Sequence, residues 1–286
     1  MIKKLHNKKG IYLMSATTGK PGVQAVIFDI SGTVLDYGSR GPVMAFIEMF
    51  AKHGVKVTVE EARGPMGTHK RDHIWSMLSD PSIAERWEKA NGKKPYPELV
   101  DILYEDFSPL QMEVIKRHCD VIPGVPAVVK DLRARGIKIA NTTGFDSWMM
   151  KDLIKLAAQG GYAPDLWVCP DEVGKGRPAP WMIMHAARKL DVYPLRTFVK
   201  VGDTTADVAE GHAAGVWVVS VIQSGNEVGH SQEELVKMPD DVRKAKFAAA
   251  RAKLAECGPH YIINTTADLM PVIDDISARI VRGERP

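Results

Sequence analysis

The chain lacks the features that mark membrane proteins, metal–thiolate sites and nucleic-acid binders. Its 286 residues contain no run of about 18 apolar side chains, so no transmembrane helix is expected. The three cysteines, Cys119, Cys169 and Cys257, are too widely spaced to suggest a metal-binding pair and are expected to be buried thiols of a cytoplasmic protein. A net charge of only +3 gives no case for binding nucleic acid or a membrane surface.

Residues 1–20 are basic and polar, and their longest apolar stretch, residues 11–14, is too short for a signal-peptide core. We expect a loose amino-terminal extension, in which Met14 could serve as an alternative start. The remaining length is enough for a full hydrophobic core together with an accessory domain.

Short apolar segments recur along the chain and predict strands over 23–28, 137–141, 166–169, 198–202, 216–222 and, more weakly, 260–264. Helical patterns lie between most of them, over 125–135, 148–158, 180–190 and 206–214. Alternation of this kind requires right-handed crossovers. The expected fold is therefore α/β, with a Rossmann-like parallel sheet at its core.

One long stretch, from Ser39 to Cys119, interrupts the alternation without a convincing strand. Its apolar spacing predicts helices over 43–53, 59–63, 69–78, 82–90 and 99–118. A helical insert directly after the first strand is best explained as a cap that excludes water and adds specificity groups. We predict a helical cap over 39–119 and a catalytic core over 21–38 and 120–286; an unrelated helical domain is the alternative.

The segment from Phe28 to Thr33 is the most informative in the chain. Asp29 follows the first predicted strand, at the edge where open α/β sheets bind their ligands. The small residues after it let main-chain N–H groups approach an anion, and Thr33 adds a hydroxyl donor. Asp29 is therefore placed to attack a phosphoryl group, to hold a metal, or both.

This D-x-[small]-G-T pattern resembles the nucleophile motif of the haloacid dehalogenase superfamily, and further motifs follow in that superfamily's order. They are a strand ending in hydroxyl residues, a cation before a helix and a strand ending in two carboxylates, at 139–144, 176–178 and 199–207. From 23 to the 260s the chain resembles the phosphonatase family, through residues 36–38, 66–73, 142–144, 176–182 and 201–204. The Met-Gly-x-x-Lys element at 66–70 is the specific one.

The phosphonatase resemblance implies Mg²⁺-dependent hydrolysis of the carbon–phosphorus bond of phosphonoacetaldehyde, giving acetaldehyde and phosphate. It also implies a homodimer that pairs through the caps. Two alternatives stay open: a hydrolase of another small phosphonate or phosphate ester, and a non-catalytic binding protein.

Asp29 is the expected nucleophile, forming an aspartyl phosphate that water later hydrolyses. Because two anions must meet, a cation has to screen them, and Mg²⁺ prefers carboxylates, waters and substrate oxygens. The expected ligands are Asp29, the main-chain carbonyl of Ser31, and Asp203. Asp207 lies one helical turn further, and either binds the metal or only complements the helix dipole.

Lys70 is expected to provide the electron sink that carbon–phosphorus cleavage needs, since an imine lets the carbon leave as an enamine. Imine formation requires the free amine, so burial or nearby cations must lower the pKa of Lys70. The resemblance implies that His73 moves protons and that Met66 packs against the imine, and helical spacing would place both on the Lys70 face. A solvated lysine, a structural histidine and a core methionine are the alternatives.

A hydroxyl at the end of the second strand should donate to the phosphoryl group, and Thr142 is favoured over Thr143 because it comes directly at the expected strand end. Arg177 should bind the phosphoryl group in bidentate fashion, with Lys175 as the alternative. The substrate-binding residues are expected to be Met66, Ser31, Thr33 and Gly144.

Several positions depart from the patterns of related proteins. Ser31 stands where phosphatases of the superfamily carry a second Asp as general acid, which a hydroxyl replaces poorly near neutral pH. Phe145 and Ser39 stand where the phosphonatase resemblance implies Tyr and Cys; neither change touches the nucleophile, the metal or the imine, and both bear on the exact substrate. The glycine-flanked loop 223–229 either approaches the site or is an ordinary surface turn.

Overall fold

The computed structural model describes residues 22–286, so the extension expected over residues 1–20 lies outside the described residues. Six parallel strands form one sheet in the order β3-β2-β1-β4-β5-β6. Their bounds are Ala25–Phe28 (β1), Lys138–Thr142 (β2), Leu166–Val168 (β3), Phe198–Gly202 (β4), Trp217–Val221 (β5) and Tyr261–Ile263 (β6). The predicted Rossmann-like parallel sheet is confirmed.

Helices cover both faces of the sheet because its central strands are apolar on both sides. In β1, Val26 and Phe28 join a hydrophobic cluster with the helices at 125–134 and 269–281, whereas Ala25 and Ile27 join a second cluster with the helix at 181–190. The core helices are α6 (Val125–Ala134), α7 (Met150–Gln159), α8 (Trp181–Leu190), α9 (Thr205–Ala214), α10 (Gln232–Lys237), α11 (Asp240–Glu256) and α12 (Leu269–Val281). The last three were not among the predicted helices.

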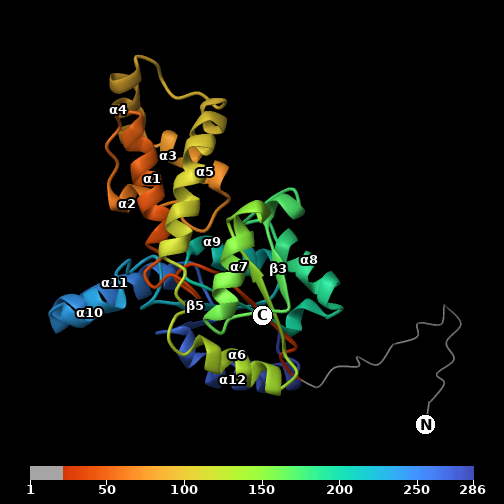
Figure 1. Cartoon of the computed structure of the whole chain (residues 1–286). Helices are drawn as coiled ribbons and strands as arrows, with labels where there is room; N and C mark the ends of the chain where they lie inside the picture. Colours follow the sequence, from red (N-terminus) through yellow and green to blue (C-terminus); the bar gives the residue numbers. More distant parts are fainter. Residues whose placement is uncertain (1–21) are drawn as a thin grey trace, which may run out of the picture.

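Five helices between β1 and β2 form a group of their own at one end of the core (Figure 1). They are α1 (Gly41–Lys52), α2 (Val59–Arg63), α3 (Lys70–Leu78), α4 (Pro81–Asn91) and α5 (Leu99–Arg117), and we call them the cap. Helices α1 and α5 pack along each other, with the rings of Phe46 and Phe107 stacked 4.4 Å apart. The helical insert is thus confirmed, while its limits at 39 and 119 stay a prediction.

Two chain segments, 36–40 and 118–120, connect the cap to the core, and Asp36 joins them. The Asp36 carboxylate accepts hydrogen bonds from the main-chain N–H groups of Arg40 and Gly41, at 3.1 and 3.0 Å. Its own N–H donates to the carbonyl of Asp120 at 3.1 Å. The two connections are therefore held side by side at the base of the cap.

Two expectations from composition can be compared with the structure. Within residues 22–286, no helix is both long enough and apolar enough to cross a membrane. The cysteines are all free, but only Cys169 is buried, whereas Cys119 and Cys257 are partly exposed. The expectation of buried thiols is therefore correct for one residue of the three.

Candidate active site

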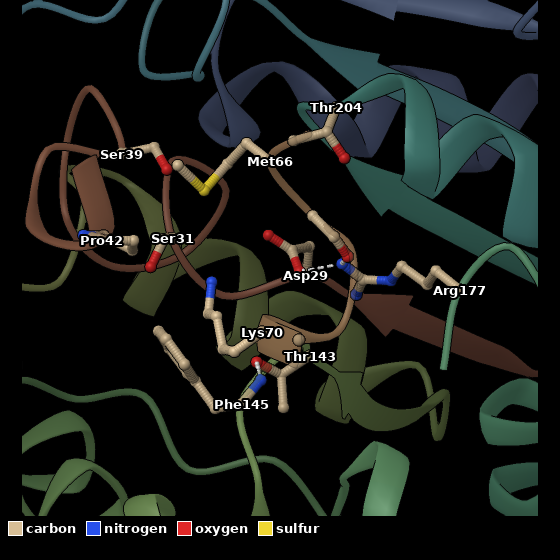
Figure 2. A pocket seen from close by; sticks show the side chains of 12 residues that line it. Asp29, Ser31, Ser39, Pro42, Met66, Lys70, Thr143, Phe145, Arg177 and Thr204 are labelled. Carbon is tan, nitrogen blue, oxygen red and sulfur yellow. Dashed lines mark hydrogen bonds and ion pairs between the residues drawn. The ribbon is translucent and has the colours of Figure 1, made fainter. Parts of the chain in front are cut away.

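A small pocket lies where the cap meets the carboxyl ends of β1, β2 and β4. The core contributes Asp29, Thr143 and Arg177, and the cap contributes Met66 and Lys70 (Figure 2). The volume open to the centre of a water molecule is about 20 Å³, whereas one water needs about 10–15 Å³. A pocket this small fits a closed position of the cap, and we expect the cap to move away when a larger molecule enters.

Arg177 is fixed in the pocket by contacts on every side of its guanidinium. Its Nη1 lies 2.7 Å from Asp29 Oδ1 and 3.1 Å from Asp207 Oδ1, and its Nε donates to Glu210 at 2.9 Å. Nη2 donates to the carbonyl and the hydroxyl of Thr142, at 2.7 and 2.9 Å, and Nη1 to the cap carbonyl of Gly67 at 3.2 Å. The arginine thus points a positive charge at Asp29 in a fixed orientation.

Three buried carboxylates, those of Asp29, Asp203 and Asp207, bring ligand atoms within 4.8 Å of one another. Asp203 is oriented by the Thr33 hydroxyl, which donates to Oδ1 at 2.8 Å. Burial, and then the neighbouring carboxylates, raise the pKa of Asp29 and strongly raise that of Asp203. Although burial alone would raise the pKa of Asp207 as well, Arg177 and Lys200 lower it.

Asp207 has a structural role in addition to its place in the carboxylate cluster. Its Oδ2 accepts hydrogen bonds from the N–H and the hydroxyl of Thr204, at 3.1 and 2.6 Å, which caps helix α9. Its Oδ1 is shared between Arg177 and Lys200, at 3.1 and 3.0 Å. The helix-terminal role considered for Asp207 is therefore present, and it does not exclude metal binding.

The charges around Asp29 fit a divalent cation. Four carboxylates, those of Asp29, Asp203, Asp207 and Glu210, face the cations Arg177 and Lys200, and Lys70 adds a third cation to the pocket when it is protonated, so negative charges still outnumber positive ones. Burial is the main cause of the raised pKa values of Asp29 and Asp203, and the neighbouring carboxylates raise them further. A hard cation such as Mg²⁺ would remove this excess, and carboxylates are the ligands it prefers.

Lys70 is a buried lysine at the start of α3, with 3 % of its surface exposed, so the solvated-lysine alternative does not apply. Its amine points toward the ring of Phe145 (Figure 2), 4.9 Å from the ring centre. It lies 5.6 Å from the ring centre of Phe46. Burial lowers the pKa of Lys70 to about 8. A useful fraction of the amine is therefore unprotonated near neutral pH, as imine chemistry requires.

His73 is buried one turn beyond Lys70 and is stacked on Phe46, with 3.8 Å between ring centres. Its Nε2 lies 2.9 Å from the carbonyl of Ala62, so this nitrogen carries the proton. Nδ1 has no hydrogen-bond partner in the described part of the chain. Burial, and then the charge of Lys70, lower the pKa of His73 well below its usual value, which leaves Nδ1 as a lone-pair acceptor.

Two glycines, one in the cap loop and one in the core, let the cap and the core approach each other closely at the pocket wall. Gly67 adopts a positive φ of 90°, and a Cβ there would collide with the hydroxyl of Thr204. A Cβ on Gly144 would collide with the carbonyl of Thr68. Gly144 therefore lines the pocket as expected, and its role is to admit the cap loop at close range.

The preference for Thr142 over Thr143 is corrected by the structure. Strand β2 extends to Thr142, one residue further than predicted, so Thr143 is the first residue beyond the strand and lines the pocket. The Thr142 hydroxyl instead lies in the buried ionic network, 2.7 Å from Lys200 Nζ and 3.0 Å from Glu210 Oε2. Lys175 is exposed and lines a neighbouring groove, so Arg177 is the cation that reaches the pocket.

The sequence analysis did not predict Lys200 and Glu210. The Glu210 carboxylate contacts both Arg177 and Lys200, and so belongs to the network that holds Arg177. Lys200 lies in the middle of β4 and is fully buried, with its amine 3.0 Å from both Asp207 and Glu210. A lysine in the centre of an apolar parallel strand must be paired with acids, because an unpaired buried charge is too costly. The sequence therefore indicates that Lys200 has acidic partners, but it does not identify them.

Cap and core also meet on the far side of Lys70. The Asp146 carboxylate of the core lies 2.8 Å from His69 Nε2 and accepts a hydrogen bond from the Tyr104 hydroxyl, both in the cap. His69 precedes Lys70 and Asp146 follows Phe145 in sequence. This contact therefore links the two chain segments that bring the Lys70 amine against the Phe145 ring.

The core side chains of this site follow β1, β2 and β4 or precede α8, at the edge where open α/β sheets bind their ligands. The family model of haloacid dehalogenase-like hydrolases matches residues 23–215, and a HAD-hydrolase-like model matches residues 174–269. The chain belongs to the phosphonoacetaldehyde hydrolase family of these enzymes.

Three relatives carry this assignment. The phosphonoacetaldehyde hydrolase of Nitratidesulfovibrio vulgaris is 42 % identical over 264 residues, which cover 92 % of this chain and 94 % of that protein. The phosphonoacetaldehyde hydrolase of Bacillus cereus strain G9842 is 41 % identical over 254 residues, with 89 % and 96 % covered. A crystal structure of a phosphonoacetaldehyde hydrolase-like protein from Oleispira antarctica is 38 % identical, covers 96 % of this chain and 100 % of its own, and superposes with a TM-score of 0.91.

Proposed function

We propose that this protein hydrolyses the carbon–phosphorus bond of phosphonoacetaldehyde and releases acetaldehyde and phosphate. The observation that carries the proposal is the buried amine of Lys70 in the same pocket as Asp29 and Arg177. Hydrolysis of a phosphate ester needs no amine but does need an acid for the leaving group, and Ser31 is a poor one. The names of the relatives support the same substrate.

The first chemical step is imine formation. The free amine of Lys70 attacks the aldehyde carbonyl, and water leaves to give a protonated imine. The lone pair on Nδ1 of His73 supports proton transfer on this face of α3. The imine accepts the electron pair of the breaking carbon–phosphorus bond, so the carbon leaves as an enamine rather than as a carbanion.

Phosphoryl transfer follows at the other end of the pocket. An Asp29 oxygen attacks phosphorus while Arg177 and the Thr143 hydroxyl stabilise the phosphoryl oxygens. Protonation of the enamine carbon and hydrolysis of the imine release acetaldehyde and restore Lys70. Water then hydrolyses the aspartyl phosphate, which releases phosphate and restores Asp29.

Mg²⁺ is the proposed cofactor, and Asp29 and Asp203 are the side chains that would hold it. The carbonyl of Ser31 and the carboxylate of Asp207 are the further proposed ligands. When bound, the cation screens the repulsion between the Asp29 carboxylate and the phosphonate. Thr33 would keep Asp203 oriented for this role, through its 2.8 Å hydrogen bond.

The direct test is release of acetaldehyde and phosphate from phosphonoacetaldehyde, with Mg²⁺ and with a chelator. We expect equal amounts of the two products with Mg²⁺, and a loss of at least about 10³-fold in rate after the cation is removed. A folded, Mg²⁺-loaded protein that releases no acetaldehyde would contradict the proposal. Turnover of phosphate esters alone would then favour the phosphatase alternative.

The pKa of Lys70 gives a pH prediction. Because imine formation needs the free amine, kcat/KM should rise with pH and level off above an apparent pKa of about 8. Burial is the main cause of this value, and the negative charge of Asp146 acts in the opposite direction by raising the pKa. Asp146→Asn should therefore move the rising limb to lower pH.

The matched control for that shift is Asp131→Asn, which removes a carboxylate exposed on α6. The ionisation of the substrate is common to all three proteins, so only a change in the enzyme can separate their profiles. If the rise of kcat/KM with pH in Asp146→Asn stays at the original pH, or moves to higher pH, the apparent pKa does not belong to Lys70.

A second substrate class is favoured by Ser39, which stands in the pocket where a cysteine was expected. The Ser39 hydroxyl is buried and has no hydrogen-bond partner among residues 22–286. Such a hydroxyl could bind a polar substituent on the aldehyde carbon chain. Comparing kcat/KM for phosphonoacetaldehyde and for hydroxylated phosphonoaldehydes would show which substrate the pocket prefers.

The homodimer is likewise a proposal. Met44 on α1 and Ile102 on α5 are about half exposed, at 53 % and 49 %, and could contribute to pairing through the cap. Light scattering on the purified protein would test the dimer. The cytoplasmic location stays a prediction.

A further inference from the structure

The loop 223–229 is part of the active-site support and not an ordinary surface turn. Its Asn226 N–H donates to Asp203 Oδ2 at 2.7 Å, and its Ser224 hydroxyl donates to the carbonyl of Gly32 at 2.7 Å. A Cβ on Gly225 would lie 2.7 Å from the Cβ of Asp203. The loop therefore packs directly against the aspartate that is proposed to hold the metal.

The guanidinium of Arg63, in the cap, donates several hydrogen bonds to this loop. Its Nη1 donates to the carbonyl and the side-chain oxygen of Asn226, at 3.2 and 3.0 Å, and its Nη2 donates to the carbonyl of Gly229 at 3.0 Å. Nη1 also approaches the carbonyls of Gly38 and Ser39, at 3.0 and 3.3 Å, in the first cap connection. One cap side chain thus holds both the connection and the loop.

The fit between Arg63 and the loop depends on main-chain shape. Gly229 has a positive φ of 69°, and a Cβ there would lie 2.6 Å from Cζ of Arg63. The guanidinium therefore lies flat against bare main chain. Hydrogen bonds from a charged donor are stronger than those between neutral groups, so several together make a substantial contact between cap and core.

We infer that Arg63 is a positioning residue that couples closure of the cap to the orientation of Asp203. In the closed structure Arg63 holds Asn226, whose main-chain N–H in turn holds the Asp203 carboxylate. When the cap opens, Arg63 leaves the loop and Asp203 loses part of its support. The phosphoryl-transfer end of the site is thus fully ordered only when Lys70 has closed over the substrate.

Such coupling is reciprocal by thermodynamic linkage: a ligand that closes the cap must tighten metal binding, and a bound metal must favour closure. Arg63 would mediate this linkage without taking part in the reaction itself, since its side chain does not line the pocket. The inference rests on the proposed function, because the closing ligand is the aldehyde bound at Lys70.

The test compares metal binding by the unmodified protein and by a closed mimic. Borohydride with phosphonoacetaldehyde and a chelator should convert Lys70 to its N-phosphonoethyl amine, which cannot be cleaved, and mass spectrometry reports the adduct. Both forms are then titrated with Mn²⁺, followed by its electron paramagnetic resonance signal. The variants are Arg63→Gln and Arg86→Gln, the latter an arginine whose hydrogen-bond partners all lie in the cap.

We expect Arg63→Gln to weaken Mn²⁺ binding to the adduct at least about fivefold more than binding to the unmodified protein. Arg86→Gln should leave the ratio of the two affinities unchanged. Equal weakening of both forms, or none, would overturn the coupling. If Arg63→Gln does not fold, Asn226→Ala removes one acceptor of Arg63 while keeping the N–H that binds Asp203, and should change the ratio in the same direction.

Hydrogen exchange on the unmodified protein tests the same link without the imine. The amides of loop 223–229 should exchange at least about tenfold faster in Arg63→Gln and at the original rate in Arg86→Gln. Unchanged exchange would overturn the role of Arg63. Absence of the adduct would contradict the proposed imine alone, so the two failures can be told apart.

Discussion

Lys70→Arg is expected to abolish release of acetaldehyde from phosphonoacetaldehyde, with a loss of about 10⁴-fold or more in kcat/KM. A guanidinium keeps the positive charge but cannot form an imine, so the breaking carbon–phosphorus bond has no electron sink. Lys70→Gln, which is smaller, should be equally inactive. Acetaldehyde release in a coupled dehydrogenase assay measures the effect.

The control for this prediction is Lys89→Arg, which makes the same substitution at an exposed lysine of α4. It should retain full activity. Thermal unfolding would establish that both Lys70 variants are folded, since arginine is larger than lysine in a nearly filled pocket. Turnover by folded Lys70→Arg at more than a few per cent of the original rate would exclude the imine.

Asp29→Ala should stop phosphoryl transfer by a factor of about 10⁴ or more and yet leave imine formation intact. The two steps use different ends of the pocket, and only the second needs the carboxylate. The charge of Asp29 raises the pKa of Lys70. Removing that charge therefore makes more free amine available at neutral pH, and trapping should be at least as fast as in the unaltered protein.

Borohydride can separate the two steps by mass. Before cleavage the reduced imine is a phosphonoethyl lysine, and after cleavage and protonation it is an ethyl lysine. With Mg²⁺ the unaltered protein should accumulate the ethyl form, whereas Asp29→Ala and Asp29→Asn should give only the phosphonoethyl form. An ethyl adduct on Lys70 in either variant would show that Asp29 is not the nucleophile.

The sheet and the cap could be predicted from the sequence because both depend on apolar periodicity. The five cap helices begin and end within about two residues of their predicted limits, and β1 reads as a buried strand since both its faces are covered. Helix α11 was missed because its sequence is mainly alanine and charged residues, with few large apolar side chains to mark a period, and only Ala250 and Leu254 are buried.

The site itself was less predictable wherever it depends on where an element ends or on contacts between distant segments. A shift of one residue in the end of β2 exchanged the expected roles of Thr142 and Thr143. The partners of Lys200 come from another element, and no spacing in the chain relates them. Arg63 binds mainly main-chain carbonyls, which leave no trace in the identity of the residues that carry them.

The fixed position of Arg177 has a consequence for how this pocket can change during evolution. Its guanidinium shares partners with Lys200 and Thr142, so replacing one member would leave a buried charge or dipole unpaired, at a cost of about 3–5 kcal/mol for a broken buried ion pair. At the opposite wall the Ser39 hydroxyl has no hydrogen-bond partner among residues 22–286 and the Phe145 side chain is uncharged, so a substitution at either leaves no buried charge unpaired. Single substitutions at the aldehyde end can therefore change the substrate specificity, whereas the residues of the phosphoryl end can change only together.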